Sequence, residues 1–229
     1  MRWLCFACCA TAILTPAAAR ASVTIAANVD RAALRVDAAG NAEVSWLAGG
    51  ARRSVLVPAQ GLLLPGGRLS GPDVSRAVTA PVLPFRRALR RTPDGRLWAL
   101  QAWRVGVPGT LELRFSRWRG APTLVTATAT LKSRTVLIEG QASFQGRPVT
   151  GYSPTPEGDP IRLSAFVDCF ACRGSGWARV TGKATRAGGK FGTFMRREWL
   201  GPRYRVIVPG PNRGTTLAPD AAVIVASPG

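Results

Sequence analysis

Apolar and polar residues alternate along most of the chain with a period of two. The clearest case is residues 111–116, Leu-Glu-Leu-Arg-Phe-Ser, where the apolar residues would face a core and Glu112, Arg114 and Ser116 would face solvent. Such alternation is typical of half-buried strands, whose successive side chains lie on opposite faces of a sheet. Similar segments predict strands at 34–36, 42–46, 54–57, 97–105, 135–142, 161–167, 177–181, 204–208 and 221–225.

Turn-forming residues separate these segments. Gly and Pro punctuate residues 37–41, 92–95, 107–109 and 187–189, each between apolar runs, and they supply the backbone angles that hairpins need. No apolar stripe of helical period exceeds about 10 residues, and the best candidate, 85–91, would be one short turn at most. The predicted fold class is therefore all-β, with mostly antiparallel strands.

The chain is long enough for two sandwich-like domains. A Thr/Ala run at 129–132 closes one series of strands and Thr135 opens another, which predicts domains over residues 22–130 and 131–229. One continuous sandwich is the alternative, because residues 123–138 could also form a single long strand pair.

Four segments of the second half form a recognisable series: GQASFQGRPV from Gly140, WARV from Trp177, ATRAGGKF from Ala184 and YRVIV from Tyr204. With these segments, residues 133–228 resemble the immunoglobulin-like and fibronectin-III-like modules of secreted bacterial proteins. This resemblance implies a seven-stranded sandwich and says little about activity. The chain departs from the pattern in lacking a pair of inter-sheet cysteines. The first half resembles no family in this way.

The first 21 residues predict a secretory signal peptide. Arg2 precedes an apolar run that Pro16 interrupts, and the small residues around Arg20 place cleavage between Ala21 and Ser22. An uncleaved membrane anchor is the alternative, although the run is shorter than the roughly 20 apolar residues that span a bilayer. Export predicts an extracytoplasmic protein with no membrane contact except through an uncleaved signal segment.

The charge balance is strongly basic. The chain has 31 Lys and Arg against 12 Asp and Glu, and loss of Arg2 and Arg20 would leave 29 against 12, a net charge of +17. Such a protein is attracted to polyanions. Outside a cell these are envelope polymers and lipid headgroups, so we expect an anionic cell-wall polymer or glycan as partner and no nucleic acid.

Two cysteines remain after the predicted cleavage, Cys169 and Cys172, in the sequence Asp-Cys-Phe-Ala-Cys-Arg. A thioredoxin-like redox site would need a following helix to stabilise the thiolate, whereas Gly-Ser-Gly and another strand pattern follow. Zinc would need four ligands, and the chain has no histidine. We therefore predict a local disulfide between Cys169 and Cys172 and no cofactor or metal.

The absence of histidine also excludes Ser-His-Asp and Cys-His catalysis. Carboxylate chemistry would need two acids roughly 5 to 10 Å apart. Glu157 and Asp159 lie close together in a Pro/Gly turn, and Asp73, Asp94 and Asp220 also occupy turns, where a backbone-capping role is favoured. The sequence thus predicts no catalytic residues.

Aromatic residues beside arginines suit sugar stacking and phosphate contact. Two segments have this pattern, and their candidate polyanion or glycan contacts are Arg114, Arg117, Trp118 and Arg119 in the first and Arg86, Arg87, Arg90 and Arg91 in the second. The competing interpretation is a solvated face plus a core tryptophan. Trp98 and Trp103 lie on opposite faces of one strand, so at least one would be exposed or packed between domains.

These observations favour a secreted, non-enzymatic β-domain protein that acts in adhesion, in scaffolding or in binding an envelope polymer. Two alternatives remain open: an exported hydrolase that uses carboxylates, and a thiol-disulfide protein that uses Cys169 and Cys172.

Overall fold

The computed structural model describes residues 22–79, 83–105, 110–144, 147–148, 164–184, 189–210, 212–213 and 216–228. The described residues form antiparallel sheets, which confirms the all-β prediction. Residues 1–21, and with them the expected signal peptide and the Ala21 side of the cleavage site, lie outside this range. The expected turn at 107–109 and residues 187–188 of the turn expected at 187–189 also lie outside it.

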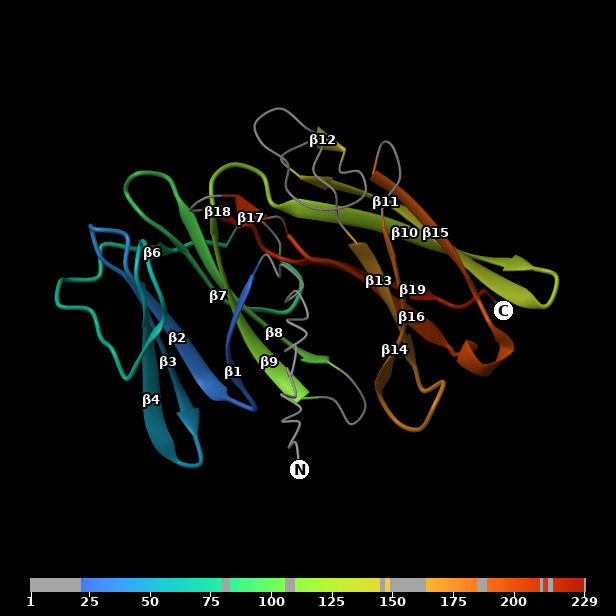
Figure 1. Ribbon diagram of the computed structural model, residues 1–229, viewed down its shortest axis with the longest axis horizontal. Coiled ribbons are helices and arrows are strands. Elements are labelled where there is room, and N and C mark those ends of the chain that lie inside the picture. The colour runs from blue at the N-terminus through green and yellow to red at the C-terminus, as the bar shows by residue number, and fades with distance from the viewer. Residues whose placement is uncertain are drawn as a thin grey trace, which may run out of the picture.

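The first part of the chain builds two facing sheets, here called the N-terminal sheet pair (Figure 1). One sheet contains β2 (Asp30–Val36), β3 (Ala42–Ala48), β4 (Ala51–Val57) and β5 (Leu64–Pro65). The other contains β1 (Val23–Ala27), β6 (Arg76–Ala77), β7 (Arg86–Arg91), β8 (Leu97–Val105) and β9 (Thr110–Trp118), joined by β17 (Asn212–Arg213) and β18 (Thr216–Leu217) from the far end of the chain.

The core of this pair lies between its two sheets. Leu34, Val44 and Val55 face Trp98, Leu100 and Phe115 across it, all of them almost completely buried, and Leu217 of β18 joins the same cluster. The C-terminal segment thus contributes to the core of the first half.

The second part of the chain builds the C-terminal sheet pair, on the right of Figure 1. One sheet contains β10 (Thr123–Lys132), β11 (Thr135–Phe144), β12 (Arg147–Pro148) and β15 (Lys190–Met195). The other contains, in spatial order, β14 (Trp177–Ala184), β13 (Ser164–Phe170), β16 (Arg203–Val208) and β19 (Ala221–Ala226). A 3-10 helix, η2 (Arg197–Trp199), connects β15 to β16.

The expected boundary at residues 130 and 131 falls inside β10. Strand β10 pairs along its whole length with β11, so residues 123–138 do lie in the strand pair that the one-sandwich alternative described. Thr216 and Leu217 lie back in the first half, where Leu217 pairs with Arg117. The division into two domains remains a prediction.

Sequence alternation located many of the strands, but it was wrong for one face of β9. Leu113 and Phe115 face the core as expected, whereas Arg114 and Ser116, expected in solvent, are 6% and 0% exposed. The reason is that the outer face of this sheet is also covered. Asp220 lies there and accepts hydrogen bonds from the side chains of Gln101 in β8 and Arg114 in β9, and the Ser22 hydroxyl donates to the Asp220 carboxylate.

Residues 85–91, the best candidate for a short helical turn, contain no helix, because residues 86–91 form strand β7. Its sequence, Arg-Arg-Ala-Leu-Arg-Arg, has arginines on both faces, so apolar alternation is not visible. Pairing with β8 determines the conformation instead.

A buried polar and aromatic cluster, here called the joint, connects the two sheet pairs. On one side the Nη1 of Arg114 donates to the carboxylate of Asp220 at 2.6 Å, and the guanidinium of Arg114 lies over the ring of Trp103, 5.1 Å from its centroid. The Ser22 hydroxyl and the Gly210 amide also donate to Asp220. Burial raises the pKa of Asp220 against the opposing effect of these three partners, so ionisation of this carboxyl depends on them.

On the other side of the joint, Arg205 donates twice to the carboxylate of Asp168 and once, at 2.9 Å, to the Arg104 carbonyl of β8. Arg179 donates to the second carboxylate oxygen of Asp168. The Arg205 guanidinium lies over Trp177, and over Phe85, which itself contacts Trp103. Trp103 is 4% exposed and packs against Phe85 and Arg114 in the joint, whereas Trp98 lies in the core of the N-terminal sheet pair, so neither is exposed. Packing of Trp103 between domains remains a prediction.

Candidate functional site

Three of the four expected contact residues on and just after β9 are buried or half-buried within the fold. Arg114 is buried in the joint, and Trp118 is 2% exposed in an apolar cluster on the outer side of its sheet. Arg117 is half-buried and donates to the carbonyls of Pro58 and Ala59 at 3.0 and 2.9 Å. Arg119 is exposed and pairs with Asp94 at 2.9 Å. Of this segment, Arg119 is the residue that a large ligand could readily reach.

The β7 arginines lie at the surface to differing extents. Arg86, Arg87 and Arg91 are exposed and Arg90 is half-buried. Arg86 donates to the Thr79 carbonyl at 2.8 Å. Neither of the two openings described below includes any of these four residues.

The acids considered for catalysis have backbone or ion-pair roles wherever they are described. Asp73 accepts from the amides of Val36 and Ser75, and Asp94 accepts from the Arg96 amide and the Thr92 hydroxyl, so both cap turns as expected. Asp220 caps the Gly210 amide and is in addition a buried partner of Arg114. Glu157 and Asp159 lie outside the described residues.

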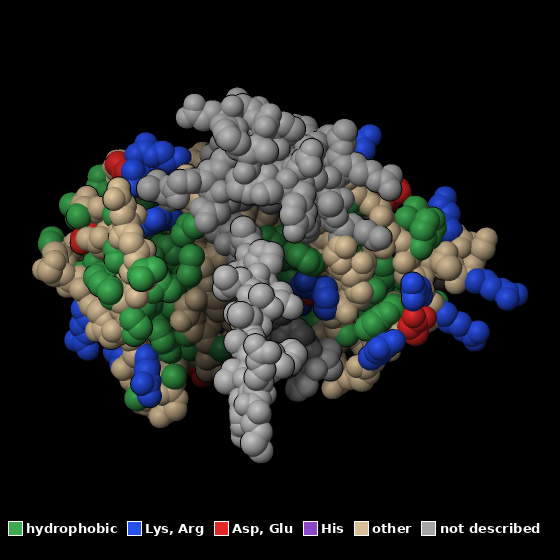
Figure 2. Space-filling view, in the orientation of Figure 1, with side chains coloured by type: hydrophobic (Ala, Val, Ile, Leu, Met, Phe, Trp, Pro, Cys, Tyr) green, Lys and Arg blue, Asp and Glu red, His purple; other side chains and the backbone are tan. Residues whose placement is uncertain are grey.

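A different set of basic residues gathers at the outer end of the C-terminal sheet pair, here called the basic end. Figure 2 shows Lys and Arg side chains at this end, on the right of the view. It comprises six exposed basic side chains: Lys132, Arg134, Arg173, Arg196, Arg197 and Arg203. Glu198 is the acidic residue in the same segments.

Three separate segments build the basic end. The β10–β11 turn lies beside residues 196–197, because Val136 pairs with Met195 at the end of β15. The β13–β14 loop reaches the same place, since the Arg173 guanidinium lies 4.1 Å from the ring centroid of Trp199 in η2. Arg203 lies over Phe170 at 4.4 Å. Arginines stacked on aromatic rings are held in place while their donors remain available to an anion.

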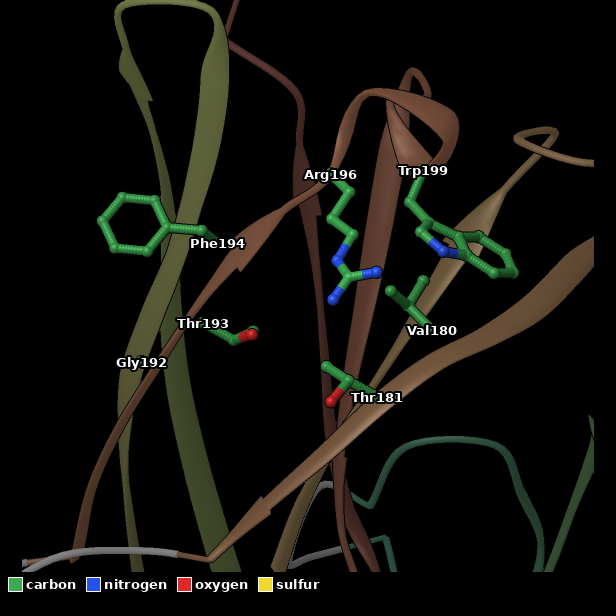
Figure 3. A pocket seen from close by; sticks show the side chains of 7 residues that line it. All are labelled: Val180, Thr181, Gly192, Thr193, Phe194, Arg196 and Trp199. Atoms are coloured by element: carbon green, nitrogen blue, oxygen red, sulfur yellow. The ribbon is translucent and has the colours of Figure 1, made fainter.

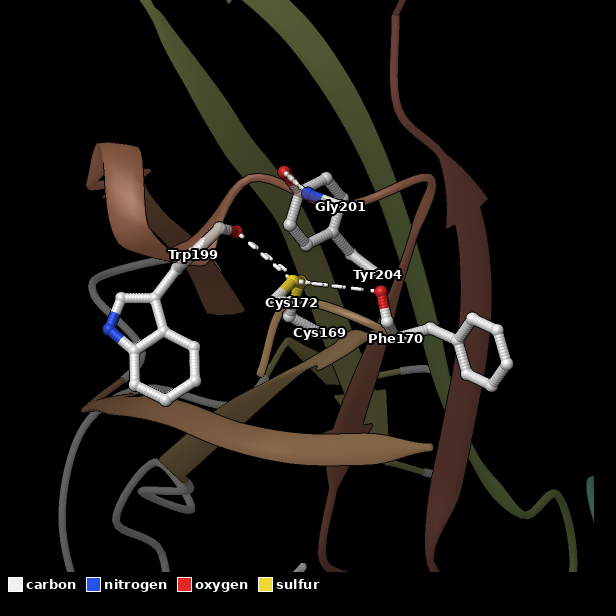
Figure 4. The surroundings of a disulfide bond; sticks show 6 residues. All are labelled: Cys169, Phe170, Cys172, Trp199, Gly201 and Tyr204. Atoms are coloured by element: carbon white, nitrogen blue, oxygen red, sulfur yellow. Dashed lines mark hydrogen bonds between the residues drawn. A yellow bond between two sulfur atoms is a disulfide. The ribbon is translucent and has the colours of Figure 1, made fainter. Parts of the chain in front are cut away.

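Cys169 and Cys172 help to hold the segment of the basic end that carries Trp199. Their sulfur atoms are at bonding distance and their Cα atoms are 5.9 Å apart, within the usual range for a disulfide (Figure 4). The Trp199 carbonyl oxygen lies 3.3 Å from the Cys169 sulfur, and any side chain at Gly201 would collide with both sulfurs. The pair therefore packs directly against the segment that carries Trp199. Residues 171–176 form a loop and no helix begins at Cys172, the feature that a thioredoxin-like site would need.

Reduction of this disulfide is expected to lower the free energy of unfolding by about 2 kcal/mol, because a four-residue loop loses its constraint in the unfolded chain. Urea denaturation with and without reductant measures the change. The Cys169→Ala/Cys172→Ala double variant is the control and should not respond to reductant. Two free thiols in unreduced protein from an oxidising compartment would contradict the disulfide.

An opening of about 620 Å³ lies next to the basic end, between the edge strands β14 and β15. Its lining residues are Val180, Thr181, Gly192, Thr193, Phe194, Arg196 and Trp199. Figure 3 shows the Arg196 guanidinium extending into the space between Thr193 of β15 and Val180 of β14, while Phe194 points away from this space, toward the other strands of its own sheet. A cation, two hydroxyls and an indole edge suit an anionic group carried on a hydroxyl-rich ligand.

A second, shallower opening of about 740 Å³ lies across β10, β11 and β15, and it shares Gly192 with the first. Polar side chains on its rim are Thr126, Thr128, Glu139, Gln141 and Lys190. All five are exposed, so a ligand from solvent can reach them.

No family model, curated protein or solved structure matches this chain. Its functional assignment therefore depends on the site itself. Within the described ranges no three His, Cys, Asp or Glu residues gather in a way that could hold a metal ion. The same residues contain no helix that is both long and apolar enough to cross a membrane.

The sequence interpretation missed the basic end, although one signal was present. Arg196, Arg197 and Trp199 form the same arginine-beside-aromatic pattern that selected residues 114–119. The contributions of Lys132, Arg134 and Arg173 could not be seen, because the fold alone brings these positions next to residues 196–199.

Proposed function

We propose that this is a secreted, non-enzymatic binding protein that uses its basic end to hold an anionic envelope polymer. The observation that supports this most directly is Arg196, which enters an opening lined by Thr181, Thr193 and Trp199 and belongs to the basic end with its five further exposed cations. In this proposal the C-terminal sheet pair is an immunoglobulin-like module, and the N-terminal sheet pair supports it through the joint.

The ligand class follows from the chemistry of the opening. A guanidinium binds carboxylate or phosphate with two parallel hydrogen bonds, and threonine hydroxyls bind the hydroxyls of sugars. Several exposed cations around one opening favour a ligand with repeated negative charges over a single small anion. An acidic polysaccharide meets both requirements, and we take it as the ligand class.

Binding is tested with fluorescently labelled polygalacturonate, measured by anisotropy, with fully methyl-esterified galacturonan as the uncharged probe. We expect the protein to bind the charged polymer, and binding to weaken as salt rises, because exposed charges are screened. The Arg173→Gln/Arg196→Gln/Arg197→Gln variant should bind roughly tenfold more weakly, since charge-assisted hydrogen bonds are lost.

The matched control is Arg86→Gln/Arg87→Gln/Arg91→Gln, which removes the same charge from β7. Its affinity should stay within about twofold of the unmodified protein, because these arginines line neither opening. A twofold change in affinity corresponds to less free energy than one such hydrogen bond contributes. Equal losses in the two triple variants would indicate attraction by net charge alone. Absence of binding at low salt would reject the proposed function.

A further inference from the structure

The two openings of the C-terminal sheet pair meet at one residue. Gly192 lines the opening between β14 and β15 and also the opening across β10 and β11. Along β15, Phe191, Thr193 and Met195 face the core, while Lys190, Gly192 and Phe194 face outward. The outer face of β15 therefore carries a side chain on each side of Gly192 and none at it.

The backbone at Gly192 does not require a glycine. A Cβ atom placed there would contact only the Cβ of Glu139, at 3.8 Å, which is ordinary van der Waals distance, and φ is not in the left-handed region. Gly140 on the neighbouring strand differs, since its Cβ would collide with the Thr126 carbonyl oxygen. Glycine in the interior of a strand weakens the strand and often marks a close approach by a ligand. The missing side chain at Gly192 leaves an open path over β15.

The chemistry on the two sides of this path differs. On the β14 side, Arg196 provides a positive charge. On the β10 side, Thr128, Glu139 and Gln141 provide hydroxyl, carboxylate and amide groups, the mixed donors and acceptors that sugar hydroxyls require. Phe194, 61% exposed and two residues from Gly192, adds an aromatic surface beside the path.

We propose that an acidic polysaccharide crosses β15 at Gly192, so that one unit places its carboxylate at Arg196 while a neighbouring unit contacts the rim of the second opening. This inference rests on the proposed function and adds that the bound polysaccharide runs across β15 and reaches both openings. The site thus recognises a hydroxyl-rich linear polymer, beyond attracting negative charge.

Gly192→Val tests the path, because valine is compatible with a strand and its side chain would stand in the crossing. We expect binding of polygalacturonate to weaken about tenfold, with no decrease in melting temperature. Binding of polyphosphate, which has repeated charges and no hydroxyls, should stay within about twofold, since Arg196 and its neighbours are unchanged.

A second pair of variants removes single hydroxyls from the same strand and face. Thr128 lies on the rim of the second opening, whereas Thr130, two residues further along β10, lines neither opening. Thr128→Val should weaken polygalacturonate binding severalfold, as expected for one lost hydrogen bond, and Thr130→Val should leave it unchanged.

The outcomes separate this inference from the proposed function. If the unmodified protein binds neither polymer, the proposed function fails. If it binds polygalacturonate but Gly192→Val binds it equally well, the path over β15 is rejected while the basic end stands. If Gly192→Val weakens both polymers equally, the substitution acts through charge attraction at Arg196, and the recognition of hydroxyls is rejected.

Discussion

Replacing Asp220 with asparagine is expected to lower the free energy of unfolding by about 3–5 kcal/mol, the usual effect of removing one partner of a buried ion pair. Arg114 is 6% exposed and Asp220 is 2% exposed, so the buried guanidinium would lose its closest counter-charge and keep only Glu112, whose carboxylate lies 3.5 Å from its Nε. The same carboxylate accepts the Ser22 hydroxyl and the Gly210 amide, which ties both ends of the described chain to the joint. The variant should therefore destabilise both sheet pairs.

Urea denaturation followed by tryptophan fluorescence measures this loss. Asp94→Asn is the control, because its pair with Arg119 is exposed, with side-chain exposures of 47% and 60%, and should contribute less than about 1 kcal/mol. If Asp220→Asn does not fold, the Arg114→Met/Asp220→Leu double variant should recover part of the stability, since it removes both charges. An Asp220→Asn protein as stable as the Asp94→Asn control would contradict a structural role for the joint.

Gly140→Ala is expected to be comparably severe, with a loss of about 3 kcal/mol or more, at the upper end for an overpacked core. A Cβ atom at Gly140 would collide with the Thr126 carbonyl oxygen, the Phe191 ring and the Ala127 Cα. Two of these are backbone atoms of the paired strand β10, so no side-chain rotation relieves the clash. Strand β10 would have to move away from β11 in the middle of their hairpin.

The matched control is Gly192→Ala, on the adjacent strand of the same sheet. The two positions lie next to each other in the pairing of β11 with β15, because Gly140 pairs with Phe191 and Glu139 pairs with Gly192. Thermal denaturation should show a melting temperature well below that of the unmodified protein for Gly140→Ala and an equal or higher one for Gly192→Ala. Similar effects at both positions would contradict the assignment of one glycine to packing and the other to an open surface.

The strands were predictable because one physical signal determines them. Period-two alternation located β8 in full and the greater part of β9, β11 and β16, since each has an apolar inner face. Strand β15 was missed, because Thr193 lies inside and Phe194 outside, the reverse of the expected polarity. Strand β7 was missed because arginines occupy four of its six positions.

The candidate site was much less predictable than the strands. Alternation along β9 placed Arg114 on a polar face, but it could not reveal that Asp220, 106 residues further along the chain, covers that face. The converse holds for the basic end, where Arg173 meets Trp199 only because β13 and β16 pair and the disulfide packs against Gly201. Local sequence indicates which faces are polar, whereas the fold decides which of them remain open to a ligand.

Binding of an acidic sugar chain at the basic end can be located by nuclear magnetic resonance of isotopically labelled protein titrated with a galacturonate oligomer. We expect chemical-shift changes at the Arg196 side chain, the Trp199 indole and the amides of Gly192 and Thr193. Changes confined to Arg86, Arg87 and Arg91 of β7, or no changes at low salt, would contradict binding at the basic end.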